Sequence, residues 1–479
     1  MQSATKVPAW AKNVRDATQI EWRRIGADQT VASIDVGKLP VRSLPDRTSD
    51  WTTDNPVMRT LSPDGRLFAL ACCGRAGIFD TRDLRLLQSF AITCDFPGHI
   101  AFDPTSTQLL VQWDDWIGAG EQGPDLGFAV LKVDVSSGAS PVSEVDDRAS
   151  QHIDAMSESL LHESWTEEEL QCFFEPLKPR LFDVLYRAQQ KRACKMHATA
   201  YYSDYRFPTF NPDEQLWSSR GTKVIALPRQ TKSTDATAVV LTIASGHVVK
   251  LRGHRGHISS AGFFPDRQEV FTYSWDGCLR IFDEVSGTRK VLLRGSPRGQ
   301  GWAAACSPDG RWIAAGNGDG IVRIWDTSIP SLSDEVRPTF EFSVLAEGQE
   351  RRRATGWPRY LQWESTGLQD GKLTLWFASD TGVWSHTIQS DSTAVSGVHF
   401  PIEPSAWEGL SLTYSPALPP VVAFDRTDKE GVVYDTHSRR CWIIRGDHRL
   451  NVHRALLLPG HRLLLPREKG LVSIIDLTP

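Results

Sequence analysis

Three short segments of the chain carry residue types and spacings that could do chemistry. Gly118, Gly120 and Gly123 have the spacing of a loop that holds a dinucleotide phosphate after a strand. His254 and His257 have a spacing that two metal ligands can use. A dense basic run that could hold a phosphate or an acidic patch on a partner consists of Arg351, Arg352 and Arg353.

The glycine-rich segment 118–123 lacks the element that dinucleotide binding needs. A phosphate is held by the N-terminus of a helix directly after the loop, whereas residues 124–127 lead into another expected strand. No phosphate-loop, serine-hydrolase or zinc-protease motif occurs in the sequence. We therefore predict a hairpin loop at 118–123 and no bound cofactor.

The cysteines show no metal or disulfide pattern. None of the eight forms a Cys-x-x-Cys pair, and their density is far below that of a disulfide-stabilised domain. Most lie in apolar, strand-like runs, such as the Phe-Ala-Leu-Ala-Cys-Cys sequence that ends at Cys73. We predict buried, reduced thiols that pack as small hydrophobic groups, and no metal site.

Repeated short segments must position these residues. Two apolar residues followed by aspartate recur at intervals of about 40 residues where the repeats are clearest. The recurrences end at Asp80, Asp283, Asp326, Asp435 and Asp476. Upstream of most of them lies a Pro-containing turn, in which proline fixes φ while Asp and Gly accept turn geometry. Short strands with such turns between them predict an antiparallel all-β fold.

This pattern resembles the WD-repeat β-propeller family, whose repeats run ~40–45 residues with four strands per blade. The match is best over residues 253–283. That segment contains Gly253-His254, Asp276 and the Phe282-Asp283 variant of the Trp-Asp pair. The resemblance is specific for the fold and says little about activity.

The resemblance implies a structural hydrogen-bond relay in the best-matched repeat. In the family it runs from the Gly-His histidine, through the turn aspartate and a strand Ser or Thr, to the aromatic position. The matching residues here are His254, Asp276, Thr272 or Ser274, and Phe282. Because Phe282 cannot donate a hydrogen bond, we predict an incomplete relay. In the next repeat the matching residues are Asp319 and Trp325, and Pro297 stands where the histidine belongs.

Eight repeats can be counted, with a seven-bladed ring as the alternative because two repeats are diverged. Their first strands are expected near Met58, His99, Arg206, Ile258, Trp302, Arg359, Leu410 and Val452. The last repeat has three strands, so we predict that residues 30–36 supply its fourth and close the ring, which removes exposed sheet edges. The predicted organisation is a lead-in and closing strand at 1–56, repeats 1–2 at 57–145, a helical insertion at 146–204 and repeats 3–8 at 205–479.

The segment 146–204 breaks the β pattern. Thr166 and Glu169 form a capping box before apolar residues at helical spacing, and Pro176 and Pro179 separate this helix from a second one. The apolar residues either bury against a neighbouring blade or protrude into a groove on a partner. The candidate partner-binding residues in this segment are Phe173, Phe174, Leu181, Phe182 and Leu185.

Seventeen tryptophans are many for a chain of 479 residues. Some, such as Trp325, are expected to pack within blades. Others stand beside Pro, Gly or Asp in loop-like surroundings, namely Trp113, Trp116, Trp357 and Trp407. Aromatic residues on loops often anchor protein interfaces, so these are candidates for partner contacts.

Charge and composition narrow the classes of partner. The net charge of −5 disfavours nucleic acid and anionic membranes as the main partners. No apolar run is long enough to span a bilayer, and the first residues lack the apolar core of a secretory signal. We expect a cytoplasmic or nuclear protein.

Catalysis has little support in the sequence. The expected first strands, which line the channel of a propeller, offer His99 and Glu364 as their obvious ionisable groups. We therefore predict a non-catalytic interaction scaffold or adaptor, a propeller subunit of a multiprotein complex that is monomeric on its own. The alternative is a propeller enzyme or a small-ligand-binding protein with its site at the mouth of the central channel.

Overall fold

A computed structural model describes most of the propeller and part of the N-terminal segment. The described residues are 2–3, 7–13, 20–26, 29–41, 57–92, 97–115, 125–135, 194–195, 198–208, 215–228, 236–296, 300–328, 336–344, 357–364, 372–388, 394–403, 410–415, 418–446, 450–467 and 470–478.

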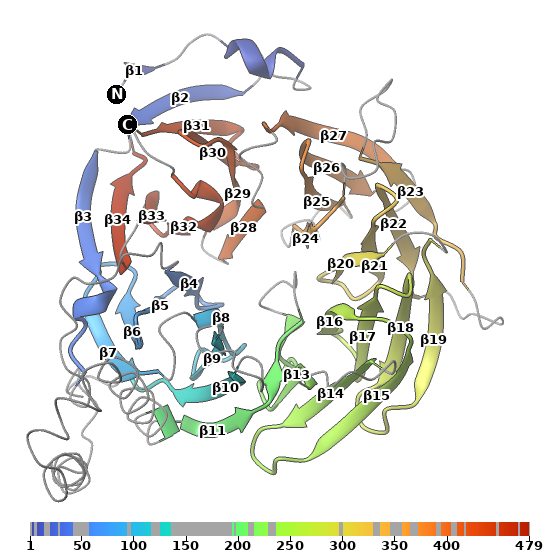
Figure 1. The fold of residues 1–479 in the computed structure, drawn as a ribbon. Helices are drawn as coiled ribbons and strands as arrows, with labels where there is room; N and C mark the ends of the chain where they lie inside the picture. Colours follow the sequence, from blue (N-terminus) through green and yellow to red (C-terminus); the bar gives the residue numbers. More distant parts are fainter. Residues whose placement is uncertain are drawn as a thin grey trace, which may run out of the picture.

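Eight β-sheets stand in a ring around a central axis, so the chain is an eight-bladed propeller (Figure 1). Blade 1 consists of β4 (Met58–Leu61), β5 (Leu67–Cys72), β6 (Arg75–Asp80) and β7 (Leu86–Ala91). Blade 2 consists of β8 (Pro97–Phe102), β9 (Gln108–Asp115), β10 (Asp125–Lys132) and β11 (Ala198–Ser203). Blade 3 consists of β12 (Tyr205–Arg206), β13 (Lys223–Pro228), β14 (Ala236–Thr242) and β15 (Val248–His254). Blade 4 consists of β16 (Ile258–Phe263), β17 (Glu269–Ser274), β18 (Cys278–Asp283) and β19 (Arg289–Arg294).

The second half of the ring has the same construction. Blade 5 consists of β20 (Gly301–Cys306), β21 (Trp312–Asn317), β22 (Ile321–Asp326) and β23 (Phe340–Ser343). Blade 6 consists of β24 (Tyr360–Trp363), β25 (Leu373–Ser379), β26 (Gly382–Ile388) and β27 (Ala394–Pro401). Blade 7 consists of β28 (Leu410–Ser415), β29 (Leu418–Thr427), β30 (Glu430–Asp435) and β31 (Arg440–Arg445). Blade 8 contains β32 (Leu456–Leu458), preceded by the short helix η7 (Val452–Arg454), then β33 (Arg462–Pro466) and β34 (Leu471–Asp476).

The repeated turns place the inner two strands of each blade. In blade 1 the Ser62 hydroxyl accepts a hydrogen bond from the Leu67 amide at 2.9 Å and donates one to Asp64 at 2.6 Å. In blade 5 the Ser307 hydroxyl accepts from the Trp312 amide at the same distance. A Ser-Pro-Asp-Gly turn therefore satisfies its own polar groups and starts the next strand in register.

The N-terminal segment closes the ring. As predicted, β3 (Thr30–Asp35) pairs antiparallel with β34 and supplies the outer strand of blade 8. The chain then passes through the short helix η3 (Val36–Lys38), whose Val36 is buried at the junction of blades 8 and 1. This pairing confirms that strands from the two ends of the sequence complete one blade.

A second N-terminal pairing extends blade 7. The strand β2 (Glu21–Gly26) runs parallel to β31, and β1 (Gln2–Ser3) pairs with β2. Trp22 is buried and lies edge-on to the ring of Trp10, which belongs to the short helix η1 (Ala9–Asn13), at 5.6 Å. The lead-in is thus part of the β-sheet core.

The predicted helical insertion needs a corrected boundary. Residues 136–193, where its helices were expected, lie outside the described residues. Residues 198–203, which were assigned to the same segment, form β11, the outer strand of blade 2. Tyr202 packs on Phe128 at 4.9 Å, and Tyr201 packs on Trp113 at 5.2 Å. These contacts bury the edge of β10, which explains why this stretch is a strand.

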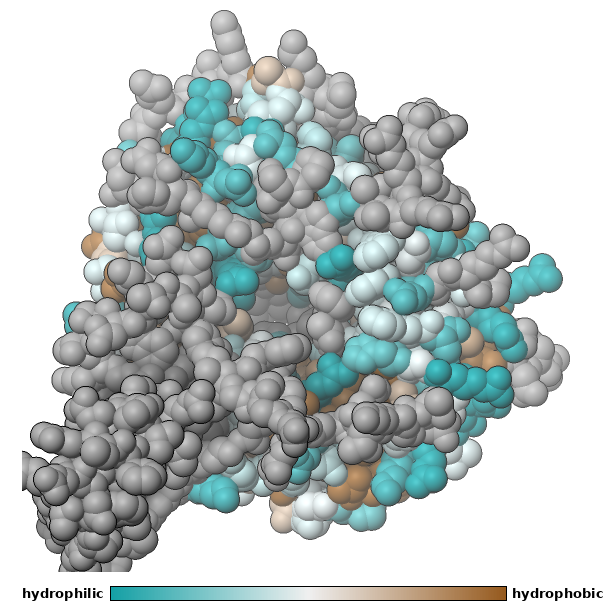
Figure 2. All heavy atoms as spheres, in the orientation of Figure 1, coloured by the Kyte–Doolittle hydropathy of each residue, from teal (hydrophilic) through white to brown (hydrophobic). Residues whose placement is uncertain are grey.

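The described helices and the described surface both bear on whether this chain could span a membrane. Among the described residues, no helix has the length and apolarity that crossing a bilayer takes. On the face of the ring that Figure 2 shows, the described residues are mostly hydrophilic or intermediate, with smaller hydrophobic areas between them.

Trp22→Ala tests whether the N-terminal strand contributes to the core. We expect the substitution to lower the free energy of unfolding by about 3–5 kcal/mol, because it removes a buried indole. Urea denaturation measures the loss. Val31→Ala in β3, where the valine is 61% exposed, is the control and should change stability by less than about 0.5 kcal/mol. Equal effects of the two substitutions would show that β2 is dispensable to the fold.

Candidate protein-binding surface

Three tryptophans from blades 4 and 5 and from the connection to blade 6 lie next to one another at one edge of the ring. Trp275 lies in the turn between β17 and β18, Trp302 lies in β20, and Trp357 precedes β24. The ring centroids of Trp275 and Trp302 are 5.7 Å apart, and those of Trp302 and Trp357 are 5.1 Å apart with nearly parallel planes. The row therefore joins blade 4 to the junction of blades 5 and 6.

Two cationic side chains and a histidine complete this cluster. The guanidinium of Arg359 lies 5.0 Å from the centroid of Trp302 and 5.3 Å from that of Trp357. The ring of His257 lies 4.9 Å from that of Trp275, and Arg206 Nη2 is 3.3 Å from His257 Nδ1. We call His257, Trp275, Trp302, Trp357 and Arg359 the tryptophan surface.

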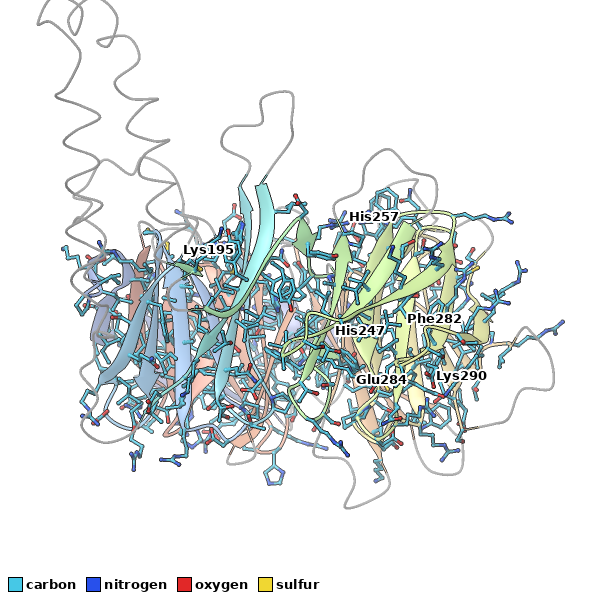
Figure 3. The ribbon with its side chains drawn as sticks, turned by 90° about the horizontal axis from the view of Figure 1, so that it is seen from below. Lys195, His247, His257, Phe282, Glu284 and Lys290 are labelled. Carbon is cyan, nitrogen blue, oxygen red and sulfur yellow. The ribbon has the colours of Figure 1, made fainter. Side chains whose placement is uncertain are left out.

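The tryptophan surface is accessible and carries fixed positive charge. Trp275 is 41% exposed, and Trp302 and Trp357 are partly exposed. Burial, helped by Arg206, lowers the pKa of His257 to about 4, so its ring is neutral at pH 7. Its Nδ1 can then accept a hydrogen bond from the arginine. In Figure 3 His257 lies near the upper edge of the ring, and Glu284 and Lys290 lie in its lower half.

The sequence identified only part of this surface. Trp357 was a candidate because it precedes a proline in a loop, whereas Trp275 and Trp302 were not singled out as anchors. Of the other loop-like tryptophans, Trp113 is buried in β9, and Trp116 and Trp407 lie outside the described residues. The exposure of Trp275 could have been predicted from the Trp-Asp-Gly sequence that starts there, since a turn residue before Asp-Gly is usually exposed.

The predicted partner-binding residues lie outside the described residues. They are Phe173, Phe174, Leu181, Phe182 and Leu185 of the expected insertion, and Arg351, Arg352 and Arg353. The three arginines precede Trp357 closely in the sequence.

The structure brings together the central members of the expected relay. His254 is fully buried, and its Nδ1 lies 3.1 Å from Asp276 Oδ2 while its Nε2 lies 2.7 Å from Thr272 Oγ1. Burial lowers the pKa of His254, so the neutral ring donates to Asp276 and accepts from the Thr272 hydroxyl. Arg280 Nη1 also donates to Asp276 Oδ2 at 2.9 Å. Burial raises the pKa of Asp276, but its contacts with His254 and Arg280 outweigh this and hold it below the usual range.

Other members of the expected relay have separate roles. The Ser274 hydroxyl donates to the carbonyl of Gly256 at 2.9 Å and so stabilises the turn. Phe282 is buried and has no donor to offer. In blade 5, Asp319 pairs with Arg323 at 2.8 Å, whereas the indole of Trp325 donates to the carbonyl of Val336 at 3.3 Å. The turn aspartate and the aromatic residue of blade 5 therefore have different partners.

The ionisable groups of the inner strands have structural partners. Glu364 accepts hydrogen bonds from Trp376 Nε1 and from the Thr436 hydroxyl, each at 3.2 Å, and so links blades 6 and 7. His99 lies in β8 with its ring 6.1 Å from that of Phe207. No cluster of three or more metal-ligating side chains occurs among the described residues.

A cavity of about 280 Å³ opens at the end of the channel where the inner strands turn. Its lining includes the inner-strand aromatic residues Phe102, Phe263 and Trp363, Trp217 before β13, the turn prolines Pro63, Pro104, Pro265 and Pro308, and the side chains of Gln215 and Gln362.

The side-chain amide of Gln215 lines this cavity and reaches past blade 4, so that it joins blade 3 to blade 5. It donates to the carbonyl of Cys306 at 2.6 Å and accepts from the Cys306 amide at 3.2 Å. The side chain passes over Gly262, where an added Cβ would lie 2.9 Å from Gln215 Cβ. Glycine at this position in β16 therefore allows blade 3 to bond to blade 5.

The ring defines the fold class of this protein, an eight-bladed β-propeller, and two of its repeats match a WD-repeat family pattern. The pattern of the family described as "WD domain, G-beta repeat" matches residues 245–283 and 297–326.

Two kinds of relative agree with this class. The chain is 38% identical over 108 residues to the guanine nucleotide-binding protein subunit beta of Oryza sativa, with the same values for the indica and japonica proteins. This match spans 21% of the chain and 28% of the rice proteins. Among solved structures, Saccharomyces cerevisiae Sqt1 superposes with a TM-score of 0.54 and 9% identity, covering 94% of this chain and 99% of Sqt1. The latter likeness concerns the fold alone.

Asp276→Ala tests the stability of the relay. We expect a loss of about 3–5 kcal/mol in the free energy of unfolding, because His254 and Arg280 would keep buried polar groups without their shared acceptor. The pKa of Asp276 is lowered in the folded state, so its contribution is complete above the unfolded pKa of about 3.9 and is lost as the pH falls further. The difference between wild type and variant should therefore narrow in acid.

The matched control is Asp83→Ala, which breaks an exposed pair with Arg85 at 3.7 Å. It should cost less than about 1 kcal/mol. Urea denaturation at several pH values measures both variants, and a loss at Asp276 as small as that at Asp83 would rule out a stabilising relay.

Proposed function

We propose that this protein is a non-catalytic interaction platform and that the tryptophan surface docks a protein partner. The observation that supports this most directly is the row of Trp275, Trp302 and Trp357 with Arg359 beside it. Trp and Arg are the residue types that most often dominate protein interfaces, and they do so when clustered. The rice relatives are named as subunits of a larger protein, which fits the same class of role.

The ring makes such a surface effective because it is stiff. Trp275 sits on a short turn between paired strands and Trp302 sits on a strand, so little conformational freedom of these two residues is lost when a partner binds. The stacked contact between Trp302 and Trp357 also restricts both indoles before binding. Preorganisation of this kind converts contact area into affinity.

The proposed partner is a protein, not a nucleic acid or a membrane. The net charge of −5 supports this choice, since both of those surfaces are anionic. A cytoplasmic or nuclear location and a monomeric state without a partner remain predictions from the sequence.

Replacing both exposed anchors tests the proposal. The tagged full chain recovers partners from its native cell extract, and the Kd of each purified partner is then measured by calorimetry for wild type and for Trp275→Ala/Trp357→Ala. We expect the double variant to weaken binding at least about 30-fold, which corresponds to the ~2 kcal/mol of an interface hot spot.

The matched control is Val285→Ala/Leu471→Ala. These side chains are 58% and 43% exposed and lie outside the tryptophan surface. The control should bind like the wild type and unfold at the same urea concentration as the wild type. A partner whose Kd is unchanged by loss of the two tryptophans would contradict the proposed docking site.

The channel cavity supports a second candidate function, the binding of a small aromatic ligand. A cavity of ~150 Å³ takes a benzene molecule and drug-sized ligands occupy ~300–1,000 Å³, so about 280 Å³ fits one or two fused rings. Among the described lining residues the Gln362 amide makes no hydrogen bond and the buried Trp217 Nε1 has no partner, so polar groups remain to orient a ligand. Asp64, Asp266 and Asp309 directly follow the rim prolines, so the mouth disfavours anions.

Titration with indole and with indole-3-acetate tests this candidate. We expect calorimetry to show binding of indole and weaker binding of the anionic acetate. Gln362→Trp should abolish indole binding by filling the cavity, whereas Gln268→Trp, on an exposed turn outside the lining, should not. Indole binding that survives Gln362→Trp would place the ligand elsewhere and contradict this function.

A further inference from the structure

Two adjacent cysteines at the end of β5 hold their sulfur atoms together. Cys72 Sγ and Cys73 Sγ are 3.0 Å apart. Cys72 is fully buried, and Cys73 is 7% exposed. The other described cysteines are Cys194, Cys278, Cys306 and Cys441.

The turn that holds the pair has an unusual residue in it. Cys72 pairs with Arg75 across the hairpin, so Cys73 and Gly74 form a two-residue connection between β5 and β6. Their φ values are +54° and +74°. Turns with positive φ at both central positions favour Asn and Gly, and the left-handed conformation costs other residues about 1–2 kcal/mol. A strained residue of this kind points to a role beyond forming the turn.

The pair lies where the ring closes. Cys72 and Cys73 belong to the hydrophobic cluster that joins blade 8 to blade 1, together with Val36 and Val472. Gly470, in the turn of blade 8, faces both thiols: an added Cβ there would lie 3.4 Å from Cys73 Sγ and 3.7 Å from Cys72 Sγ. The thiols are therefore bordered by the backbone of a neighbouring turn.

Two other cysteines provide a chemical contrast. Burial raises the pKa of the Cys306 thiol and of the Cys441 thiol well above the usual range. Neither has a second sulfur beside it.

We propose that Cys72 and Cys73 form a reversible dithiol oxidation site that reacts with hydroperoxides. The thiolate of Cys73, the more exposed of the two, attacks one peroxide oxygen; the O–O bond breaks and water leaves, which produces a sulfenic acid. The sulfur of Cys72 then attacks the sulfur of Cys73, the S–O bond breaks and a second water leaves. Two thiols are oxidised to one disulfide, and one hydrogen peroxide is reduced to two water molecules.

The same geometry makes the disulfide easy to reduce. The peptide bond between the two residues is trans, which sets their Cα atoms about 3.8 Å apart. Disulfides normally span ~4.4–6.8 Å between Cα atoms, and departures from that range store strain. Strained disulfides have high reduction potentials, so a glutathione-type thiol restores the dithiol. This site is independent of partner binding at the tryptophan surface.

A peptide map of the full chain tests the proposal. The folded protein is treated with hydrogen peroxide, quenched, unfolded, alkylated and digested with trypsin. Cleavage after Arg66 and Arg75 isolates Cys72 and Cys73 in one peptide that contains no other cysteine. We expect this peptide to lose the mass of two hydrogen atoms and to take up no alkyl group, and reduced glutathione should return it to the doubly alkylated form.

The peptide 441–445 supplies an internal control, since Cys441 should remain alkylated throughout. The variant Cys73→Asn keeps a residue that suits the positive-φ turn, so it should fold at least as well as the wild type. In this variant Cys72 should stay available to alkylation at peroxide concentrations that oxidise the wild-type pair. Two alkylated cysteines in the wild-type peptide, or added oxygen in place of lost hydrogen, would overturn the proposal.

Discussion

The pairing of β3 with β34 is the contact on which the rest of the structure depends. A ring of sheets has no free edges only if its last blade is completed, and here that blade takes one strand from residues 30–35 and three from the end of the described chain. Without this pairing, blades 8 and 1 would expose the apolar cluster that holds Val36, Leu464 and Val472. The positions of the turns on both edges of the ring follow from this closure.

Closure also divides the molecule into parts with different constraints. The inner strands meet around the axis, where Gln215 can reach the backbone of Cys306 because Gly262 leaves room. Polar side chains also connect blades farther from the axis, as the hydrogen bonds of Glu364 with Trp376 and Thr436 illustrate. Some turns also connect blades, as Thr436 does, whereas the turn that contains Trp275 leaves this side chain exposed for contact with other molecules.

Local chemistry made most of the fold predictable from the sequence. The Pro-Asp turns and the apolar-apolar-Asp marks define hairpins from neighbouring residues, and the three-stranded last repeat called for residues 30–36. Pairings between distant segments were harder to predict: the parallel register of β2 on β31 joins Glu21 to Arg440, and no local pattern encodes it.

The tryptophan surface was missed in part for the same reason, since Trp275, Trp302 and Trp357 become neighbours only when blades 4 to 6 are stacked in order. The strand β11 was missed because the helical spacing of the residues before it led us to assign the whole of 146–204 to a helical insertion.

The turn between the second and third strands shows how one position in the repeat acquires different roles. In blade 4 it holds Asp276 for the buried His254 and exposes Trp275 to solvent, so a single turn serves both stability and contact. In blade 5 the corresponding Asp319 pairs with Arg323 in place of a histidine. In blade 1 the turn is shortened to Cys73 and Gly74, and the polar pair is replaced by two thiols. Because strand pairing on both sides fixes the ends of the turn, its side chains can change without moving the blade. In blades 1, 4 and 5 the side chains of this turn therefore differ while the strands on both sides stay paired.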